Sequence, residues 1–159
     1  MDKEMENFVE DAKHFCSLAE GLVISMDRLK ELMLSVLRLY EKALHLPNTE
    51  PSEADYSQST ISALPLKMEI RDYYWSVFDP FDDSDEDKVV CMMISDDIND
   101  IYRDLKEGLR AYESGDFDTA IWIWKFGVDN HWGGTCGQSD QSASLDKNRS
   151  HFKVTFIFI

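Results

Sequence analysis

Residues 112–133 read Tyr112-Glu-Ser-Gly-Asp-Phe-Asp-Thr-Ala-Ile-Trp-Ile-Trp-Lys-Phe-Gly-Val-Asp-Asn-His131-Trp-Gly133 and hold three of the chain's four tryptophans. The Ser-Gly pair is typical of a helix end, and Asp116 can cap a following helix, which we expect over residues 117–130. Residues two apart on a helix project about 200° from each other, so Trp122 and Trp124 cannot share a face. One of the two indoles must therefore point outward or toward a neighbouring element.

The chain upstream of this run carries apolar residues that recur every three or four positions, as they do on helices that bury one face. The pattern predicts four helices, over about residues 8–23, 27–46, 61–78 and 87–112. Ser25 or Asp27 can cap the second of them. With the helix after Asp116 the total is five, and no stretch before residue 133 reads as a convincing strand. We therefore expect an all-α, single-domain bundle of about five helices.

The composition changes after residue 133. Residues 134–150 consist mostly of Gly, Ser, Gln and Asp, which bury too little apolar area to offset the entropy lost on ordering. The last eight residues, 152–159, form instead a short apolar run with β propensity. The sequence therefore divides into a helical bundle domain, residues 1–133, and an irregular or disordered tail, residues 134–159, outside the core.

A chain of 159 residues can bury a sizeable core without metals or disulfides. Cys16, Cys91 and Cys136 lie far apart and form no Cys-x-x-Cys pair, so reduced thiols are expected. The acidic N-terminus does not resemble a signal peptide, and no apolar run approaches the ~20 residues that cross a bilayer. These features predict a cytoplasmic protein.

The formal net charge of −15 repels phosphate backbones and anionic lipid, and no basic patch interrupts it. The sequence therefore predicts no nucleic-acid partner and no membrane partner. A protein partner remains open, as does a homodimer through an exposed helix face.

Two acidic clusters could suggest metal binding. In the run of residues 82–87, an EF-hand register would place Lys88 where the loop needs Gly and Ile94 where it needs Glu, so that pattern fails. The second cluster lies at helical spacing and consists of Asp96, Asp97, Asp100 and Asp104. It lacks the Glu-x-x-His partners of a di-metal bundle, so a solvated acidic flank is its default interpretation, with Asp97 and Asp104 nearest the apolar face.

Aromatic residues gather in the segments around Trp75 and Trp124, and aromatics at helical spacing usually belong to a core. An outward indole beside His131 would instead form a ledge for a ligand or a partner. We take as candidate ligand-binding residues Tyr74, Trp75, Asp97, Asp104, Trp124, His131 and Trp132.

The chain shows no nucleophile beside a base, no phosphate-binding loop and no cofactor motif. No catalytic residue, cofactor or bound metal is therefore predicted. The sequence favours a non-catalytic protein-interaction or ligand-binding module. The alternative is a small metal-dependent hydrolase or binding protein that uses Asp97, Asp104 and His131.

Several short motifs together resemble one known family. They are Leu46-Pro47, Tyr74-Trp75 with Phe78-Asp79-Pro80, the stretch Asp97-Ile-Asn-Asp-Ile-Tyr-Arg-Asp-Leu-Lys-Glu-Gly-Leu109, and Trp124 followed by His131-Trp132-Gly133. Over residues of about 5 to 133 the chain resembles the bacterial family catalogued as domain of unknown function 5063. The resemblance implies a small bacterial helical protein with no assigned activity. Members of the family continue with another histidine and a short helix, whereas this chain continues Gly134-Thr-Cys-Gly and leaves His131 without that second histidine.

Overall fold

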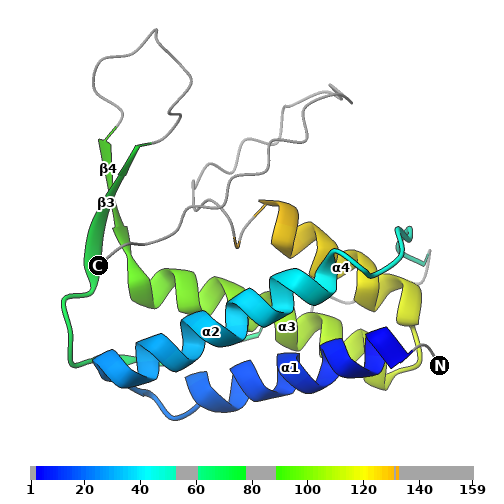
Figure 1. The fold of residues 1–159 in the computed structure, drawn as a ribbon, viewed down its shortest axis with the longest axis horizontal. Coiled ribbons are helices and arrows are strands. Elements are labelled where there is room, and N and C mark those ends of the chain that lie inside the picture. The colour runs from blue at the N-terminus through cyan, green and yellow to red at the C-terminus, as the bar shows by residue number, and fades with distance from the viewer. Residues whose placement is uncertain (1–2, 53–60, 78–88, 131, 133–159) are drawn as a thin grey trace, which may run out of the picture.

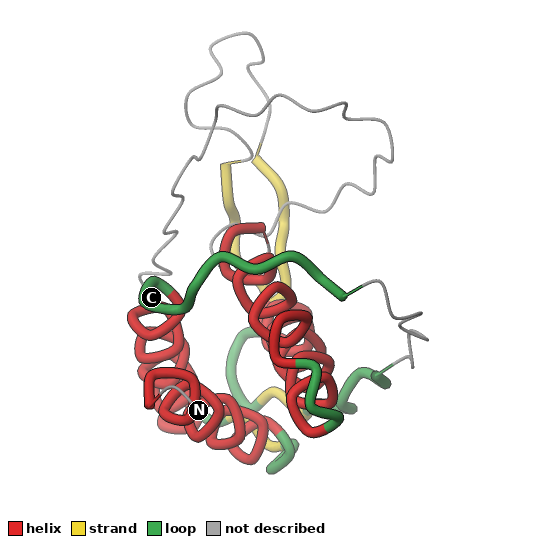
Figure 2. The backbone as a smooth tube through the Cα atoms, turned by 90° about the vertical axis from the view of Figure 1, so that its right-hand side faces the viewer, coloured by secondary structure: helices red, strands yellow, loops and turns green. Residues whose placement is uncertain are grey.

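The computed structural model of the chain describes residues 3–52, 61–77, 89–130 and 132. Its helices pack in two layers, with α1 against α2 and α3 against α4 (Figures 1 and 2). Contacts between α1 and α3 join the layers. The four helices are α1 (Lys3–Ala19), α2 (Met26–Ala43), α3 (Ile94–Glu113) and α4 (Phe117–Asn130). The described part of the chain is thus mostly helical, as expected.

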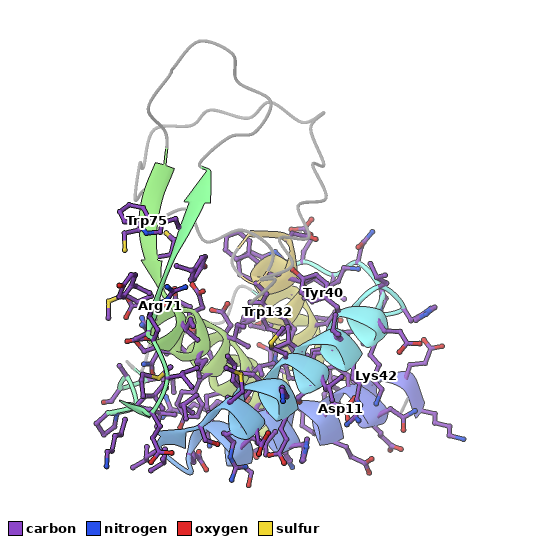
Figure 3. All side chains as sticks on the ribbon, turned by 60° about the vertical axis from the view of Figure 1, so that its left-hand side comes forward. Asp11, Tyr40, Lys42, Arg71, Trp75 and Trp132 are labelled. Atoms are coloured by element: carbon purple, nitrogen blue, oxygen red, sulfur yellow. The ribbon has the colours of Figure 1, made fainter. Side chains whose placement is uncertain are left out.

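The first two helices turn where the sequence indicates. The Ser25 hydroxyl caps α2 by accepting a hydrogen bond of 3.3 Å from the backbone N–H of Arg28, which satisfies one of the free donors of a helix start. Further along the pair, the Lys42 amine lies 2.6 Å from the Asp11 carboxylate and donates to the Asn7 carbonyl at 2.9 Å (Figure 3). The apolar face of each helix is buried between them.

The turn between α3 and α4 also follows the prediction. Gly115 has a φ of 87°, a left-handed conformation that suits glycine after a helix. Asp116 then accepts a hydrogen bond of 3.2 Å from the Thr119 N–H at the start of α4. The stretch of residues 112–133 therefore closes a helical hairpin.

The predicted helix over residues 61–78 is wrong. In its place lie an extended segment and two strands, β2 (Lys67–Met68) and β3 (Tyr73–Val77). β2 pairs in parallel with β1 (Val23–Ile24), and β3 pairs antiparallel with β4 (Val89–Met93). A β-hairpin therefore rises from the bundle (Figures 1 and 2). The described residues form a bundle of four helices with short strands, and not the all-α bundle of five helices that the sequence predicts.

The predicted helix over residues 87–112 begins later, at Ile94, because the residues before it belong to β4. Its cap comes from outside the helix: Asp72 accepts hydrogen bonds from the Ser95 N–H at 2.8 Å and from the Ser95 hydroxyl at 2.7 Å. Met93, at the N-cap position, has no side-chain acceptor to offer. Asp72 thus fixes the base of the hairpin to the start of α3.

Some expectations fall outside the described residues, namely the acidic run 82–87, His131 and the tail 134–159. Among the helices that are described, none combines the length and the apolar character needed to cross a membrane.

Candidate functional site

Trp124, one of the candidate ligand-binding residues, lies in the core. Its side chain is 0% exposed and packs against Phe8 with ring centroids 4.7 Å apart. The indole N–H points to the Leu105 carbonyl at 3.4 Å. Trp122, two residues earlier, is 37% exposed, which confirms that the two indoles point in different directions.

Tyr74 and Asp97 connect the hairpin to α3. The Tyr74 hydroxyl, on β3, donates a hydrogen bond of 2.6 Å to Asp97 Oδ2 in the first turn of the helix. Short bonds from a hydroxyl to a carboxylate are among the stronger hydrogen bonds in proteins. The structure therefore brings these two candidates together, in a contact that ties two elements to each other.

Trp132 and Asp104 form a second pair. The Trp132 indole N–H donates to Asp104 Oδ2 at 3.0 Å, and the ring stands edge-on to Tyr40 of α2, with centroids 6.3 Å apart (Figure 3). The Tyr40 hydroxyl donates to the Val128 carbonyl at 3.3 Å, and burial raises the pKa of Tyr40 to about 12. These contacts join the end of α4 to both α2 and α3.

Trp75 stands apart from both pairs. Its side chain is 66% exposed on the hairpin, and Figure 3 shows it above the helices. Its neighbour Tyr73 is also exposed and packs under the Arg71 guanidinium, which lies 5.3 Å from the ring centroid. Among the described candidates, Tyr74 with Asp97 and Trp132 with Asp104 therefore form two separate hydrogen-bonded pairs, and the indole of Trp75 is exposed.

The acidic strip of α3 is spread along the helix. Asp97 and Asp104 are seven residues apart, which corresponds to about 10 Å along the axis, and Asp100 between them pairs with Arg103 at 3.0 Å. Within residues 3–52, 61–77, 89–130 and 132, no three side chains of the metal-ligating types are close enough to hold an ion together.

A partly open cleft lies between α1, α3 and the extended segment 61–64. Its volume is about 660 Å³, within the range of roughly 300–1,000 Å³ that is typical of small-molecule sites. Its lining combines apolar, hydroxyl and charged side chains: Lys13, Cys16, Ser17, Glu20, Ile61, Ser62, Ala63, Leu64, Tyr102, Lys106, Leu109, Arg110 and Glu113.

Two polar residues of this cleft contact the same carboxylate oxygen of a third. Glu20 Oε1 lies 2.7 Å from the Lys106 amine and accepts a hydrogen bond of 3.0 Å from the Tyr102 hydroxyl. The Lys106 amine also lies 5.5 Å from the centroid of the Tyr102 ring. The hydrogen bond with Lys106 lowers the pKa of Glu20 and raises the pKa of Lys106, so both remain charged near neutral pH.

The thiol and the phenol that line the cleft, those of Cys16 and Tyr102, are held in their neutral forms. Burial raises the pKa of the Cys16 thiol to about 12. The pKa of Tyr102 is raised by burial and by its hydrogen bond to Glu20. Neither environment activates its group for catalysis.

Asn99 positions the segment 61–64, which lines one side of the cleft. Its side chain accepts from the Leu64 N–H at 2.7 Å and donates to the Leu64 carbonyl at 3.3 Å and the Ser95 carbonyl at 3.0 Å. Asn99 is buried, where an amide needs such partners. The segment 61–64 is thereby fixed against α3.

This cleft could not be predicted from the sequence. Its residues come from three distant segments, and the wall at 61–64 was expected to be helical. The only available signal was the spacing of Tyr102, Lys106 and Arg110, which places three donors on one side of α3.

The comparisons with curated proteins and with solved structures give no match. A family described as a domain of unknown function (DUF5063) matches residues 1–142, which include all the helices and strands that the structure describes and the cleft. The chain belongs to this family of domains of unknown function, DUF5063.

Proposed function

We propose that this protein is a non-catalytic ligand-binding module that holds a small organic anion in the cleft between α1 and α3. One observation carries the proposal. The chain as a whole has 16 basic and 31 acidic residues, whereas the cleft lining has three basic residues and two acidic ones. In a strongly acidic protein, this local reversal favours an anionic ligand.

The chemistry of the lining defines the ligand further. Cys16, Leu64 and Leu109 offer apolar surface, and Lys13 and Arg110 add positive charge. A carboxylate on a short apolar body would satisfy both, because charge-assisted bonds to Lys and Arg are favourable in a partly desolvated site. Such a ligand would leave the pair between Glu20 and Lys106 intact.

The neutral state of Cys16 and Tyr102 supports binding over catalysis in this cleft. A metal-dependent hydrolase built on Asp97, Asp104 and His131 is the alternative from the sequence. The hydrogen bonds that Tyr74 and Trp132 donate to the two carboxylates, and the distance between these carboxylates along α3, make it the less favoured function.

Protein binding is a second candidate, favoured by the exposure of Trp75 on β3. Exposed tryptophans are enriched among residues that dominate binding energy at interfaces, and the outer edge of a two-stranded ribbon can accept an extended peptide. Under this candidate, Trp75→Ala weakens binding of an apolar extended peptide and leaves the melting temperature unchanged. Equal binding by the variant and the native chain excludes it.

Thermal unfolding of the full chain with hexanoate, benzoate and inorganic phosphate tests the cleft. A ligand at about 100 times its Kd adds about 2.7 kcal/mol, which corresponds to roughly 5 to 11 °C for a chain of this size. The variant Lys13→Gln/Arg110→Gln should lose this shift. Arg103→Gln/Lys67→Gln, which removes the same charge outside the cleft, should keep it.

Each outcome has a clear meaning. A shift with hexanoate or benzoate that only the cleft variant loses supports the proposal, and a shift with phosphate alone would replace the apolar carboxylate by an inorganic anion. If no probe shifts the transition, or if both double variants respond like the native chain, the cleft is not an anion site.

A further inference from the structure

α2 carries apolar residues on two opposite faces. The inner face, with Leu32 and Leu39, is buried in the bundle. On the outer face, Leu34, Leu37 and Leu44 are 55%, 45% and 57% exposed. A helix that needs only one buried face normally carries polar residues opposite to it, so the outer leucines require another explanation.

The outer residues follow the spacing of a coiled-coil seam. Steps of four and three residues lead along the exposed positions Lys30, Leu34, Leu37, Glu41 and Leu44. Side chains at this spacing stay on one stripe of a helix and interlock with the same stripe of a second helix. Leu32 and Leu39 lie on the other side of the helix, so the seam and the internal core do not compete for the same residues. α2 also lies at the front of the molecule in Figure 1, with no other described helix in front of it.

The charge of α2 favours a second copy of this chain as the occupant. α2 has four basic and three acidic residues, and among the four described helices it alone has more basic than acidic ones. Two copies with a formal net charge of −15 each repel through their other surfaces. Among symmetric contacts, in which a helix meets its own copy across a two-fold axis, association is therefore least opposed where α2 meets α2.

The order of residues along the seam then selects the antiparallel arrangement. A two-fold axis between Ser35 and Val36 places Leu34 opposite Leu37 of the second copy. The same axis places Lys30 opposite Glu41. A parallel pair would instead set Lys30 against Lys30 and Glu41 against Glu41, which is repulsive.

The residues beside the seam fit the same axis. Glu31 comes to lie beside Arg38 of the second copy, which adds a further pair of opposite charges on each side. In the single copy, Lys30 and Glu31 pair only locally, with Asp27 at 3.6 Å and with Arg28 at 3.2 Å. These pairs are exposed, so exchanging them for pairs across an interface costs little.

We propose that two copies of this chain associate through an antiparallel pair of α2 helices with the seam Lys30, Leu34, Leu37 and Glu41, beyond which Leu44 meets Asp27 of the second copy. The seam extends over about 18 Å of helix. Stable interfaces bury roughly 1,200–2,000 Å² in total, and one helix pair of this length lies at the low end. The dimer is therefore weak, and its population depends on concentration. The seam lies outside the cleft and is independent of its ligand.

Sedimentation of the full chain from about 1 µM to about 1 mM, in salt that screens the net charge beyond about 8 Å, tests the dimer. The native chain should change from monomer to dimer within this range. Leu37→Lys should weaken the dimer roughly tenfold or more, because two apolar contacts are lost. Phe126→Lys on α4, a residue with the same exposed fraction of 45%, is the matched control and should dimerise normally. Circular dichroism melts establish that both variants are folded.

A charge exchange tests the antiparallel register itself. Lys30→Glu and Glu41→Lys should each weaken the dimer about 2- to 30-fold, because two ion pairs become like-charge contacts, and the double variant should restore it. A chain that stays monomeric throughout the range overturns the proposal, as does a Phe126→Lys variant that weakens the dimer as much as Leu37→Lys. If the double variant is not restored, the antiparallel α2 pair is wrong.

Discussion

The indole of Trp124 packs directly against Gly108. A Cβ atom on this glycine would overlap three ring atoms of the buried side chain. Gly108 lies in the middle of α3, where glycine is unfavourable by roughly 1 kcal/mol relative to alanine. Its presence there is explained by the close approach of α4. Gly108 and Trp124 together therefore set the distance between α3 and α4.

Gly108→Ala should therefore destabilise the protein despite the better helix propensity of alanine. Overpacking of a filled core costs about 1–3 kcal/mol or more, which exceeds the gain in propensity. Urea unfolding of the variant measures the loss. The same change in a Trp124→Leu background should cost much less, because the smaller side chain leaves room for the methyl group. An equal loss in both backgrounds would contradict this account.

Trp132→Phe should lower the free energy of unfolding by about 1 kcal/mol. The phenyl ring keeps most of the packing against Tyr40, but Asp104 loses the indole N–H that donates to it at 3.0 Å. Hydrogen bonds to charged groups contribute about 1.5–3 kcal/mol, and the partial exposure of Asp104 allows water to replace part of this. Trp122→Phe, on the exposed side of α4, is the control and should change the free energy by only a few tenths of a kcal/mol. A larger loss for the control than for Trp132→Phe would show that the hydrogen bond contributes little.

The parts of the fold that follow from local signals could be predicted from the sequence. Ser25 caps α2, Gly115 ends the turn after α3, and Asp116 starts α4, because each feature depends on side chains only a few residues apart. The outward position of Trp122 and the inward position of Trp124 followed from helix geometry alone.

The hairpin could not be derived in the same way. Tyr73-Tyr-Trp-Ser-Val77 is rich in aromatic residues, which suit strands as well as packed helix faces. Its strand partner, β4, follows an intervening acidic run and lies where the apolar pattern predicts the start of a long helix. Exposed Tyr73, half-buried Tyr74 and exposed Trp75 show the alternation of a strand in the structure. Because all three residues are aromatic, the sequence itself carries no period-two pattern here.

The candidate site was predictable only in part. The pairs of Tyr74 with Asp97 and of Trp132 with Asp104 lie among the residues chosen from the sequence, but the contacts within each pair depend on the hairpin and on the end of α4. The cleft depends on Asn99, which binds the Leu64 backbone from 35 residues away. A single sequence carries no local pattern for a contact of this kind.

Glu107→Gln should raise stability at neutral pH. Burial and the neighbouring Asp104 raise the pKa of Glu107 in the folded state above its ordinary value of 4.5. The unfolded chain therefore ionises first as the pH rises, and the folded state loses stability between the unfolded and the folded pKa. The gain from Gln should be absent below about pH 4, appear as the pH rises through this window and then level off. Melting curves from pH 3 to pH 8 measure it, and a gain that is the same at every pH would exclude ionisation as its cause.

Cys91 should react with iodoacetamide in the native protein, and Cys16 should not. Cys91 is exposed, whereas Cys16 is buried and its thiol pKa is about 12. The reagent therefore cannot reach Cys16, and its thiol does not ionise to the reactive thiolate. Peptide mass spectrometry after brief alkylation distinguishes the two sites. Addition of urea should make Cys16 reactive. Native labelling of Cys16 at the rate of Cys91 would mean that the cleft opens far more than its packing indicates.

Ending the chain after residue 133 or after residue 142 should leave the melting temperature within a few degrees of the full length. The polar composition of residues 134–150 underlies this expectation. The family match continues to residue 142, so the pair of truncations tests where the domain ends. If the chain that stops at 133 unfolds at a much lower temperature than the one that stops at 142, residues 134–142 belong to the domain.

The parallel contact between β1 and β2 has a consequence for the order in which the chain folds. The helical hairpins α1–α2 and α3–α4 close over short turns, so their contacts can form early. β1 and β2 join residues about 40 apart in the chain, and closing so large a loop costs entropy that only a nearly complete bundle can offset. We therefore expect the bonds from the Lys67 N–H to the Leu22 carbonyl and from the Glu69 N–H to the Ile24 carbonyl to form after the folding barrier. Substitutions along this strand pair should accelerate unfolding and leave the refolding rate almost unchanged.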